Sequence, residues 1–549
     1  MKSWKSLAGT EGGRSLGVAS TRWIKDHLAL VGFAAAELAA LPLLLVWGRH
    51  GWFTQDDWDF LSARTIGSAH DLFRPHFQHW TTLPILPYRL LWTMVGIRSY
   101  TPYQALIVVM HLIAAALVLV VMRRAGVRPW LATIVAVLFV YFGAGAENIL
   151  VAFQITFVGA LVFGLAQLLL ADHDGPIGRR DWFGLLAGWA GLMCSGVAIT
   201  MTVVVGVAIL LRRGPRGWRV ALFHTAPLAG AYLVWLSLAP KGQNTRSYRS
   251  HSVTQISRFV WSGTEGAFAR LGQVPGVGIA LALILIGGLA VLFQSRGRRV
   301  PLDCLAVPVA LLAGGLLFLV VTGAARAGQG GLRARESRYL YMVAAMALPA
   351  VALAADALIR RWRQLAVPVV AVLLLGVPGN IRQLADTGSV RQFENAKLTR
   401  SQLLALGRLP LADQLRDSHL PVTVQYPRYA QEGLTYGWLV AGVESGRIPA
   451  PAPGPAIPLQ TATWVLQNFL VKSEALAPRG CAPAPPVSFR VLERGRTLTV
   501  AHGDVYLRYA PEGGAKSFRI RVAPSTLTAL VGPLRLQIVP VGKTAELCT

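Results

Sequence analysis

Charged residues are scarce in this sequence. They make up 14% of its 549 residues, whereas an ordinary soluble domain carries roughly 25%. Hydrophobic residues account for 54% and gather into repeated long runs. Length alone would favour several globular domains, but these runs exclude a chain built only of such domains. The sequence therefore predicts a polytopic integral membrane protein.

Acidic residues are the rarer charge, with 26 against 53 lysines and arginines and a formal net charge of +27. In a soluble protein this excess would raise the question of nucleic acid. Here the basic residues form short clusters between apolar runs, as topology signals and lipid-headgroup contacts do. We therefore predict that these basic residues contact the lipid bilayer and that the protein does not bind nucleic acid.

Cysteine is also rare, with four in the chain, and no paired CxxC spacing typical of a metal site occurs. Cys194 and Cys304 lie in apolar runs, as inert packing residues do. Cys481 and Cys548 bracket the end of the chain, and we predict a disulfide between them in an oxidising compartment. The sequence specifies no cofactor and leaves a divalent metal requirement open.

Eleven apolar stretches are candidates for crossing the bilayer core. They are residues 28–47, 103–122, 129–146, 152–171, 181–194, 197–211, 219–238, 277–294, 302–322, 340–359 and 364–379. The first has about 20 residues, more than the 7 to 15 of a usual signal-peptide core. We therefore favour a retained span over a cleaved signal peptide.

The stretch from Asp181 to Leu211 has two interpretations, one overlong tilted helix or a hairpin broken near Ser195-Gly196. With the hairpin, every second loop carries an arginine cluster, and these alternating clusters face the side of the N-terminus, as the positive-inside rule requires. They begin at Arg123, Arg179, Arg212, Arg296 and Arg360. A single helix would place the last three clusters outside. We therefore predict the hairpin, a cytoplasmic N-terminus and an extracytoplasmic C-terminus.

This topology predicts a transmembrane part, residues 1–379, and an extracytoplasmic domain, residues 380–549. It also places the loop 48–102 outside. Near the end of the chain apolar residues alternate at a period of two, as half-buried strands require. These positions are Val487, Phe489 and Val491, then Val505, Leu507 and Tyr509, then Phe518, Ile520 and Val522, and finally Leu534, Leu536 and Ile538. We predict an α-helical membrane protein with a C-terminal α+β or β-rich domain.

Three aspartates, Asp56, Asp57 and Asp59, occupy four positions directly after the first span. In one interpretation they are merely solvated beside an interfacial belt of the neighbouring tryptophan and phenylalanine side chains. In the other, one carboxylate acts as a general base at the membrane surface, where partial desolvation raises its pKa toward the working pH.

The chain resembles the GT-C superfamily of polytopic glycosyltransferases, which take sugar from a polyprenyl-phosphate donor. The resemblance rests on the adjacent acids Asp56-Asp57 in the first external loop, the amphipathic stretch LPILPYRLLWTMVGI in that loop, the number of spans and the external C-terminal domain. It implies an inverting hexosyl- or pentosyltransferase of the cell envelope, whose acceptor is a glycan or a protein. By this match Asp56 is the general base and Asp57 the alternative. Many members have glutamate as the second acid, where this chain has aspartate.

A phosphate leaving group needs cationic side chains near the outer bilayer surface. Two external clusters offer them, one in the first loop and one before the tenth span. The candidates for binding the donor phosphate are His76, His79, Arg333, Arg335 and Arg338. Solvated loop residues are the alternative, but external arginines run against the positive-inside bias and suit a lipid-linked phosphate.

The sugar or the acceptor needs polar partners as well. Glu147, Asn148 and Gln154 surround the short turn between the third and fourth spans, where they either cap helices or bind sugar hydroxyls. Tyr339, next to the external arginines, joins them as a candidate. Two other functions stay open, a transporter or flippase of lipid-linked glycans and a non-catalytic envelope scaffold. A transporter would favour charged residues or broken helices at mid-membrane.

Overall fold

The computed structural model describes most of the helical part of the chain and shorter pieces of the C-terminal part. The described residues are 11–53, 56–239, 248–294, 302–386, 396, 399–400, 403–404, 421–423, 430–449, 470–473, 480–509, 520–530 and 532–548.

The chain divides into two compact units. Unit 1 comprises Met1–Arg49, Leu72–Leu86 and Thr101–Val390, and unit 2 comprises His50–Asp71, Pro87–Tyr100 and Arg391–Thr549. The sequence predicts a single boundary between residues 379 and 380. The units divide the chain differently, because two segments of the loop 48–102, His50–Asp71 and Pro87–Tyr100, group with the C-terminal residues.

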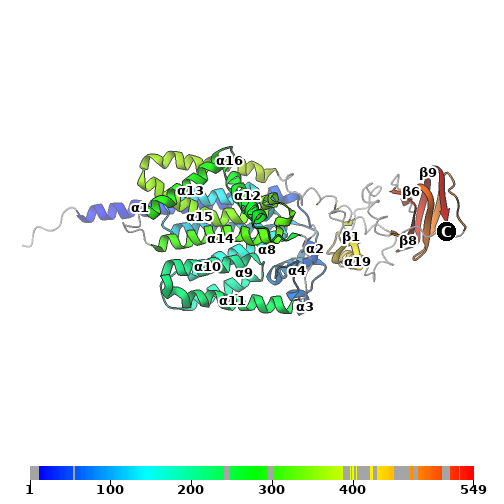
Figure 1. Cartoon of the computed structure of the whole chain (residues 1–549), viewed down its shortest axis with the longest axis horizontal. Helices are drawn as coiled ribbons and strands as arrows, with labels where there is room; N and C mark the ends of the chain where they lie inside the picture. The colour runs from blue at the N-terminus through cyan, green and yellow to red at the C-terminus, as the bar shows by residue number, and fades with distance from the viewer. Residues whose placement is uncertain are drawn as a thin grey trace, which may run out of the picture. The chain divides into compact units, whose positions relative to one another are not determined.

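Long helices form most of the described part of unit 1. They are α1 (Glu11–Trp47), α5 (Thr101–Arg124), α6 (Pro129–Val140), α8 (Ile155–Ala171), α9 (Arg179–Leu192), α10 (Val197–Arg213), α11 (Trp218–Leu238), α12 (Val253–Gly272), α13 (Val277–Gln294), α14 (Leu302–Arg326), α15 (Ser337–Arg361) and α16 (Ala366–Ala385). Several of them, such as α10, α11 and α14, run roughly parallel to one another (Figure 1). A helix occupies each range that the sequence predicts as a span.

Among the described residues, eight helical stretches are long and apolar enough to cross a membrane, or nine if the bent pair Pro129–Val140 and Gly143–Leu150 is one span. The sequence predicts eleven. Two features account for the rest of the difference. Helix α9 has only 14 residues, and α10 and α11 fall within one apolar stretch of 42 residues, Val197–Leu238.

The predicted break near Ser195-Gly196 is present in the structure. Helix α9 ends at Leu192 and α10 begins at Val197, and α9 packs against both α8 and α10. Residues 181–211 therefore form two helices and not one long one.

Helix α15 lies at the centre of unit 1, and the whole of its apolar window is buried. It packs against α13 and α14. Small residues make this possible: a Cβ on Gly288 of α13 would lie 2.3 Å from the Ala354 carbonyl oxygen. Close approach of backbones through glycine and alanine is a usual way to pack helices in a membrane, where lipid tails compete for apolar contacts.

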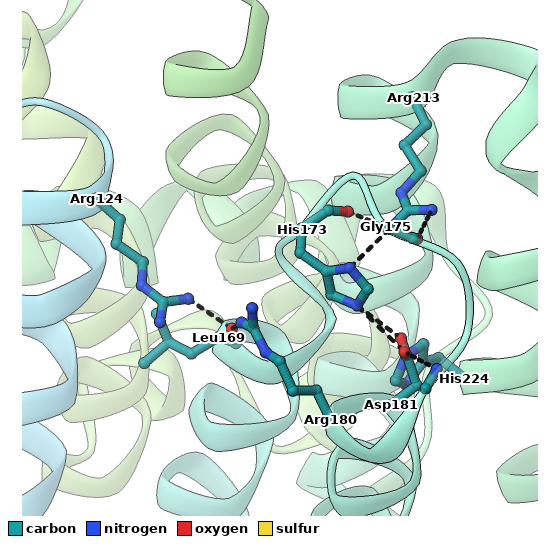
Figure 2. Close-up of polar contacts among 9 residues, drawn as sticks. Arg124, Leu169, His173, Gly175, Arg180, Asp181, Arg213 and His224 are labelled. Atoms are coloured by element: carbon teal, nitrogen blue, oxygen red, sulfur yellow. Dashed lines mark hydrogen bonds and ion pairs between the residues drawn. The ribbon is translucent and has the colours of Figure 1, made fainter.

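A buried carboxylate ties together the ends of three helices. Asp181, near the start of α9, accepts hydrogen bonds from His173 Nε2 at 3.1 Å, from His224 Nε2 of α11 at 3.0 Å and from the Gly178 N–H at 2.8 Å (Figure 2). Arg213, at the end of α10, donates to the Gly175 carbonyl at 3.0 Å. The connection between α8 and α9 is thus held to the ends of α10 and α11.

A seven-stranded antiparallel sheet lies in the described C-terminal residues. Its strands are β3 (Leu470–Ser473), β4 (Ala482–Pro483), β5 (Ser488–Leu492), β6 (Thr497–Tyr509), β7 (Ile520–Val522), β8 (Ser525–Ala529) and β9 (Leu534–Cys548). The order is β3-β8-β6-β9-β4, with β5 paired to β9 and β7 to β6. Cys481 and Cys548 are joined by a disulfide, with their Cα atoms 4.2 Å apart.

Most of the alternating residues lie in strands, although Val487 precedes β5 and Phe518 lies outside the described residues. Not all of the strand residues face the interior. Val505 and Leu507 of β6 are fully buried, whereas Phe489 and Val491 of β5 are 54% and 56% exposed. Register explains the difference. Phe489 lies opposite Gln537 of β9, and its neighbour Arg490 lies opposite Leu536. Phe489 and Val491 therefore lie on the face of the sheet where β9 carries polar side chains.

Two smaller parts of unit 2 matter for the site. One is the strand pair β1 (Pro421–Thr423) and β2 (Ala430–Thr435), which leads into α19 (Tyr436–Glu444). The other is the short helix α2 (Asp57–Leu61), which follows the first span. Helix α2 packs against β2.

Candidate functional site

The three aspartates of the first loop have different environments in unit 2. Asp57 is fully buried and accepts a hydrogen bond from Tyr88 Oη at 2.7 Å. Asp59 accepts from Arg64 Nε at 2.9 Å, and Arg64 is itself fully buried. Asp56 directly precedes α2 and is partly exposed. Of the adjacent acids, Asp56 is therefore the more exposed one.

The aromatic residues around these acids pack against one another within unit 2. The Trp58 ring contacts Trp438 of α19 edge to face at 6.3 Å, and Trp438 stacks on Trp92 at 4.7 Å. The aromatic residues that follow the first span are all less than 9% exposed. They are Trp52, Phe53, Trp58 and Phe60. The interpretation of these side chains as an interfacial belt is wrong, because they face the protein and hold α2 in place.

The histidines of the first loop lie in unit 1, on a tight turn. The backbone of His76 and His79 exchanges two hydrogen bonds, of 3.0 Å and 2.9 Å. The His79 Nδ1 atom accepts a hydrogen bond from the Gly196 N–H at 3.3 Å. A Cβ at position 196 would lie 2.9 Å from that nitrogen, so the break between α9 and α10 needs glycine to receive the ring.

The charge state of His79 follows from its surroundings. Its burial, followed by the positive charges of His76, Arg326 and Arg338, lowers its pKa from 6.5 to about 4. Its Nδ1 atom already accepts a hydrogen bond and needs a lone pair to do so. At neutral pH His79 is thus an uncharged hydrogen-bonding group and adds no positive charge to the site.

The arginines before α15 form ion pairs with two glutamates. Glu336 accepts from Arg338 Nε at 3.1 Å and from Arg333 at 2.6 Å. Burial of Glu336 would raise its pKa, but the two arginines outweigh that effect and hold the pKa below its usual value. Arg335 points elsewhere and pairs with Glu265 of α12.

Arg338 connects these arginines with the turn between the third and fourth predicted spans. Its guanidinium interacts electrostatically with the Glu147 carboxylate, and it is one of the cations that act on His79. Glu147 Oε1 accepts a hydrogen bond from Gln154 Nε2 at 2.7 Å. Predicted candidates from three separate segments, His76 and His79, Glu147 and Gln154, and Arg338, therefore meet in unit 1.

Two other candidates are buried. Asn148 is fully buried, and neither atom of its side-chain amide has a hydrogen-bond partner among the described residues. Tyr339 is 7% exposed and packs its ring between Phe259 and Phe318, with both centroids 6.1 Å away. Tyr339 supports the Arg338 guanidinium, which lies 5.4 Å from its ring, and does not offer an open ring face.

The Arg335 side chain lies on a different surface from that of Arg338. It lines a hollow of about 700 Å³ between α12 and the short helix η8 (Gly331–Arg335), together with Arg258 and several small polar side chains. Trp261 and Leu332 flank the hollow and are 74% and 75% exposed. Two cations beside exposed apolar side chains match an amphipathic ligand whose head is a phosphate.

No protein-family model and no curated protein matches this chain. The described residues also contain no group of three or more His, Cys, Asp or Glu side chains that could hold a metal ion. The arguments about function therefore rest on the geometry of the chain itself.

Sequence reasoning missed several partners of the candidate residues. Tyr88 lies 31 positions from Asp57, and no spacing rule connects them. Arg326, at the end of α14, acts on His79 from a different part of the chain. The role of Glu336 could have been predicted from the sequence, because an acid inside the segment RARESR indicates that it pairs with the neighbouring arginines.

Proposed function

We propose that this protein is a GT-C-type membrane glycosyltransferase, which moves a sugar from a polyprenyl-phosphate donor to a glycan or protein acceptor of the cell envelope. The single observation that carries the proposal is the difference between two adjacent acids. Asp57 is sequestered by Tyr88, while Asp56 is left partly exposed next to it. Such a division of roles is expected where one carboxylate is structural and the other meets a substrate.

In the proposed reaction, Asp56 is the general base. Its carboxylate takes the proton of the acceptor hydroxyl as that oxygen bonds to the anomeric carbon. The bond between the anomeric carbon and the phosphate oxygen breaks on the opposite face, and the lipid phosphate leaves with the bonding electron pair. Configuration at the anomeric carbon is inverted.

The cations that offset the charge of the leaving group are arginines in this proposal. His79 is neutral at neutral pH by its environment, so it serves as a hydrogen-bonding group and not as a counter-ion. Arg338 is 35% exposed and Arg335 49% exposed, and guanidinium binds phosphate oxygens in a bidentate manner. Glu147 and Gln154 are the proposed partners of sugar hydroxyls.

The proposed membrane arrangement has eleven spans, a cytoplasmic N-terminus and an extracytoplasmic C-terminal domain. It is supported by a helix in each predicted range and by the break between α9 and α10. Helix α9 is short, but it exposes Trp182, Phe183 and Leu186, which suits a helix in contact with lipid.

The test of the proposal is transfer of labelled sugar from a synthetic polyprenyl-phosphate donor by the purified protein. We expect Asp56→Asn to lower kcat by about 100-fold or more with little change in donor affinity, because a general base acts chiefly in the transition state. Thermal unfolding of this variant should match the wild type.

Asp57→Asn is the matched control, one position away with the same change of charge. It should lower the unfolding temperature, because it disturbs a buried hydrogen bond with Tyr88. Wild-type turnover in both variants would refute the catalytic role, and a transporter or scaffold would then be the better explanation.

A further inference from the structure

A second basic surface contains none of the candidate site residues. A recess of about 550 Å³ lies where α5 and α15 end and where α6 and α16 begin. Arg123, Arg128 and Arg360 line it on one side. In the proposed topology these helix ends lie on the cytoplasmic side, but the recess itself is independent of the proposed catalytic function.

Two arginines of this recess are held in place by a single carboxylate. Asp356 of α15 is 2% exposed and accepts from Arg128 Nε and from Arg360 Nε, each at 2.5 Å. Arg360 also donates to the Gly126 carbonyl at 2.8 Å. Because two guanidinium groups share one acid, the recess keeps an excess of positive charge.

These guanidinium groups are ordered and still accessible. The Arg128 side chain is 45% exposed and the Arg360 side chain 59% exposed. Arg123 Nη1 donates a hydrogen bond to the Val127 carbonyl oxygen at 2.9 Å, which orients its side chain. A ligand phosphate would meet arginines whose positions are already fixed, which reduces the entropy lost on binding.

The rest of the recess is apolar. Trp130, Ile134 and Val370 line it, and Trp130 is 48% exposed. A free phosphate would gain nothing from such a wall, whereas a lipid could place its acyl chains there and its headgroup at the arginines. Basic recesses between helix ends at the cytoplasmic side of membrane proteins are typical sites for anionic lipid headgroups.

We propose that this recess binds an anionic phospholipid, whose phosphate is held by Arg123, Arg128 and Arg360 and whose acyl chains lie along Trp130 and Ile134. Charge complementarity selects the anionic headgroup, and the apolar wall selects a lipid over a soluble anion. The bound lipid would join the α5–α6 connection to the α15–α16 connection.

The test measures binding of phosphatidylglycerol to the purified full-length protein in detergent micelles, with phosphatidylcholine and inorganic phosphate as separate competitors. Arg123→Gln leaves the Asp356 ion pairs intact and should weaken phosphatidylglycerol binding about fivefold, since one basic residue near the surface contributes about 1 kcal/mol. Phosphatidylcholine and millimolar inorganic phosphate should not displace the bound lipid.

A triple variant, Arg128→Gln, Arg360→Gln and Asp356→Asn, removes the other two cations without leaving a buried charge unpaired. It should weaken binding at least as much as Arg123→Gln and keep the wild-type circular dichroism. Arg216→Gln, an exposed arginine outside the recess, is the matched control and should bind normally. Equal binding by all variants, equal loss in the control, or displacement by inorganic phosphate would overturn the proposal.

Discussion

Arg338 interacts with several of the ionisable side chains of the candidate site. It pairs with Glu336, interacts with Glu147 and helps to keep His79 neutral. Arg333 shares only the first of these contacts among those described. A comparison of the two arginines can therefore separate binding of a ligand phosphate from support of Glu336.

We predict that Arg338→Ala weakens binding of the polyprenyl-phosphate donor about tenfold or more, because a hydrogen bond to a charged group is worth about 1.5 to 3 kcal/mol. Arg338→Lys should recover only part of the affinity, since the bidentate fork is lost. Donor affinity and kcat would be measured in parallel. If Arg333→Ala lowered donor affinity equally, Arg338 would be only a support for Glu336.

At this scale the sequence identifies candidate residues but not the environment of each side chain. Acids and arginines are conspicuous in a chain with only 14% charged residues, and their positions beside predicted spans place them in loops. Whether an acid is buried depends on long-range contacts such as Asp57 with Tyr88. Likewise, nothing in the local sequence indicates that Gly196 binds the ring of His79.

At the scale of single elements, the connection between α8 and α9 depends on one buried acid. His173 and His224 both use Nε2 toward Asp181, so each is a hydrogen-bond donor to a carboxylate. Both Asp181 and His224 are fully buried. The ionised carboxylate is stabilised there only as long as these donors remain in place.

We predict that Asp181→Asn destabilises the protein by about 3 kcal/mol, because it breaks a buried charge network with three donors. The loss should appear as a lower unfolding temperature in detergent and as faster proteolysis between α8 and α9. Asp174→Asn is the control. Asp174 lies in the same connection but is 66% exposed, so its replacement should change the unfolding temperature little.

Helices were easier to predict than strand faces for a physical reason. A long apolar run specifies a buried or lipid-facing helix without reference to any other segment. A strand's inner face depends on register with its neighbour, and a shift of one residue exchanges the two faces. Strand β5 illustrates this, because its pairing with β9 exposes Phe489 and Val491 despite the regular alternation.

At the scale of the whole molecule, the proposed topology depends on whether α9 crosses the membrane. Its 14 residues extend over about 21 Å, less than a hydrocarbon core of about 30 Å. Flanking residues and local thinning of the bilayer would have to supply the rest. If α9 does not cross, every later segment changes sides and the arginine clusters after it become external.

We predict that α9 does cross, because only then do the clusters at Arg212 and Arg213 and at Arg360 and Arg361 obey the positive-inside rule. Fusions of a reporter that is active only in the cytoplasm should be active after Arg213 and after Arg361, and inactive after Gly276. A reporter that is active only outside should show the reverse pattern at the same three sites. The fusion after Gly276 is the internal control. It lies before α13 and should therefore report the side of the membrane opposite to the cytoplasmic sites. Activity of the external reporter after Arg213 would remove α9 as a span, and the C-terminal domain would then have to lie in the cytoplasm, where the Cys481–Cys548 disulfide would not be expected to persist.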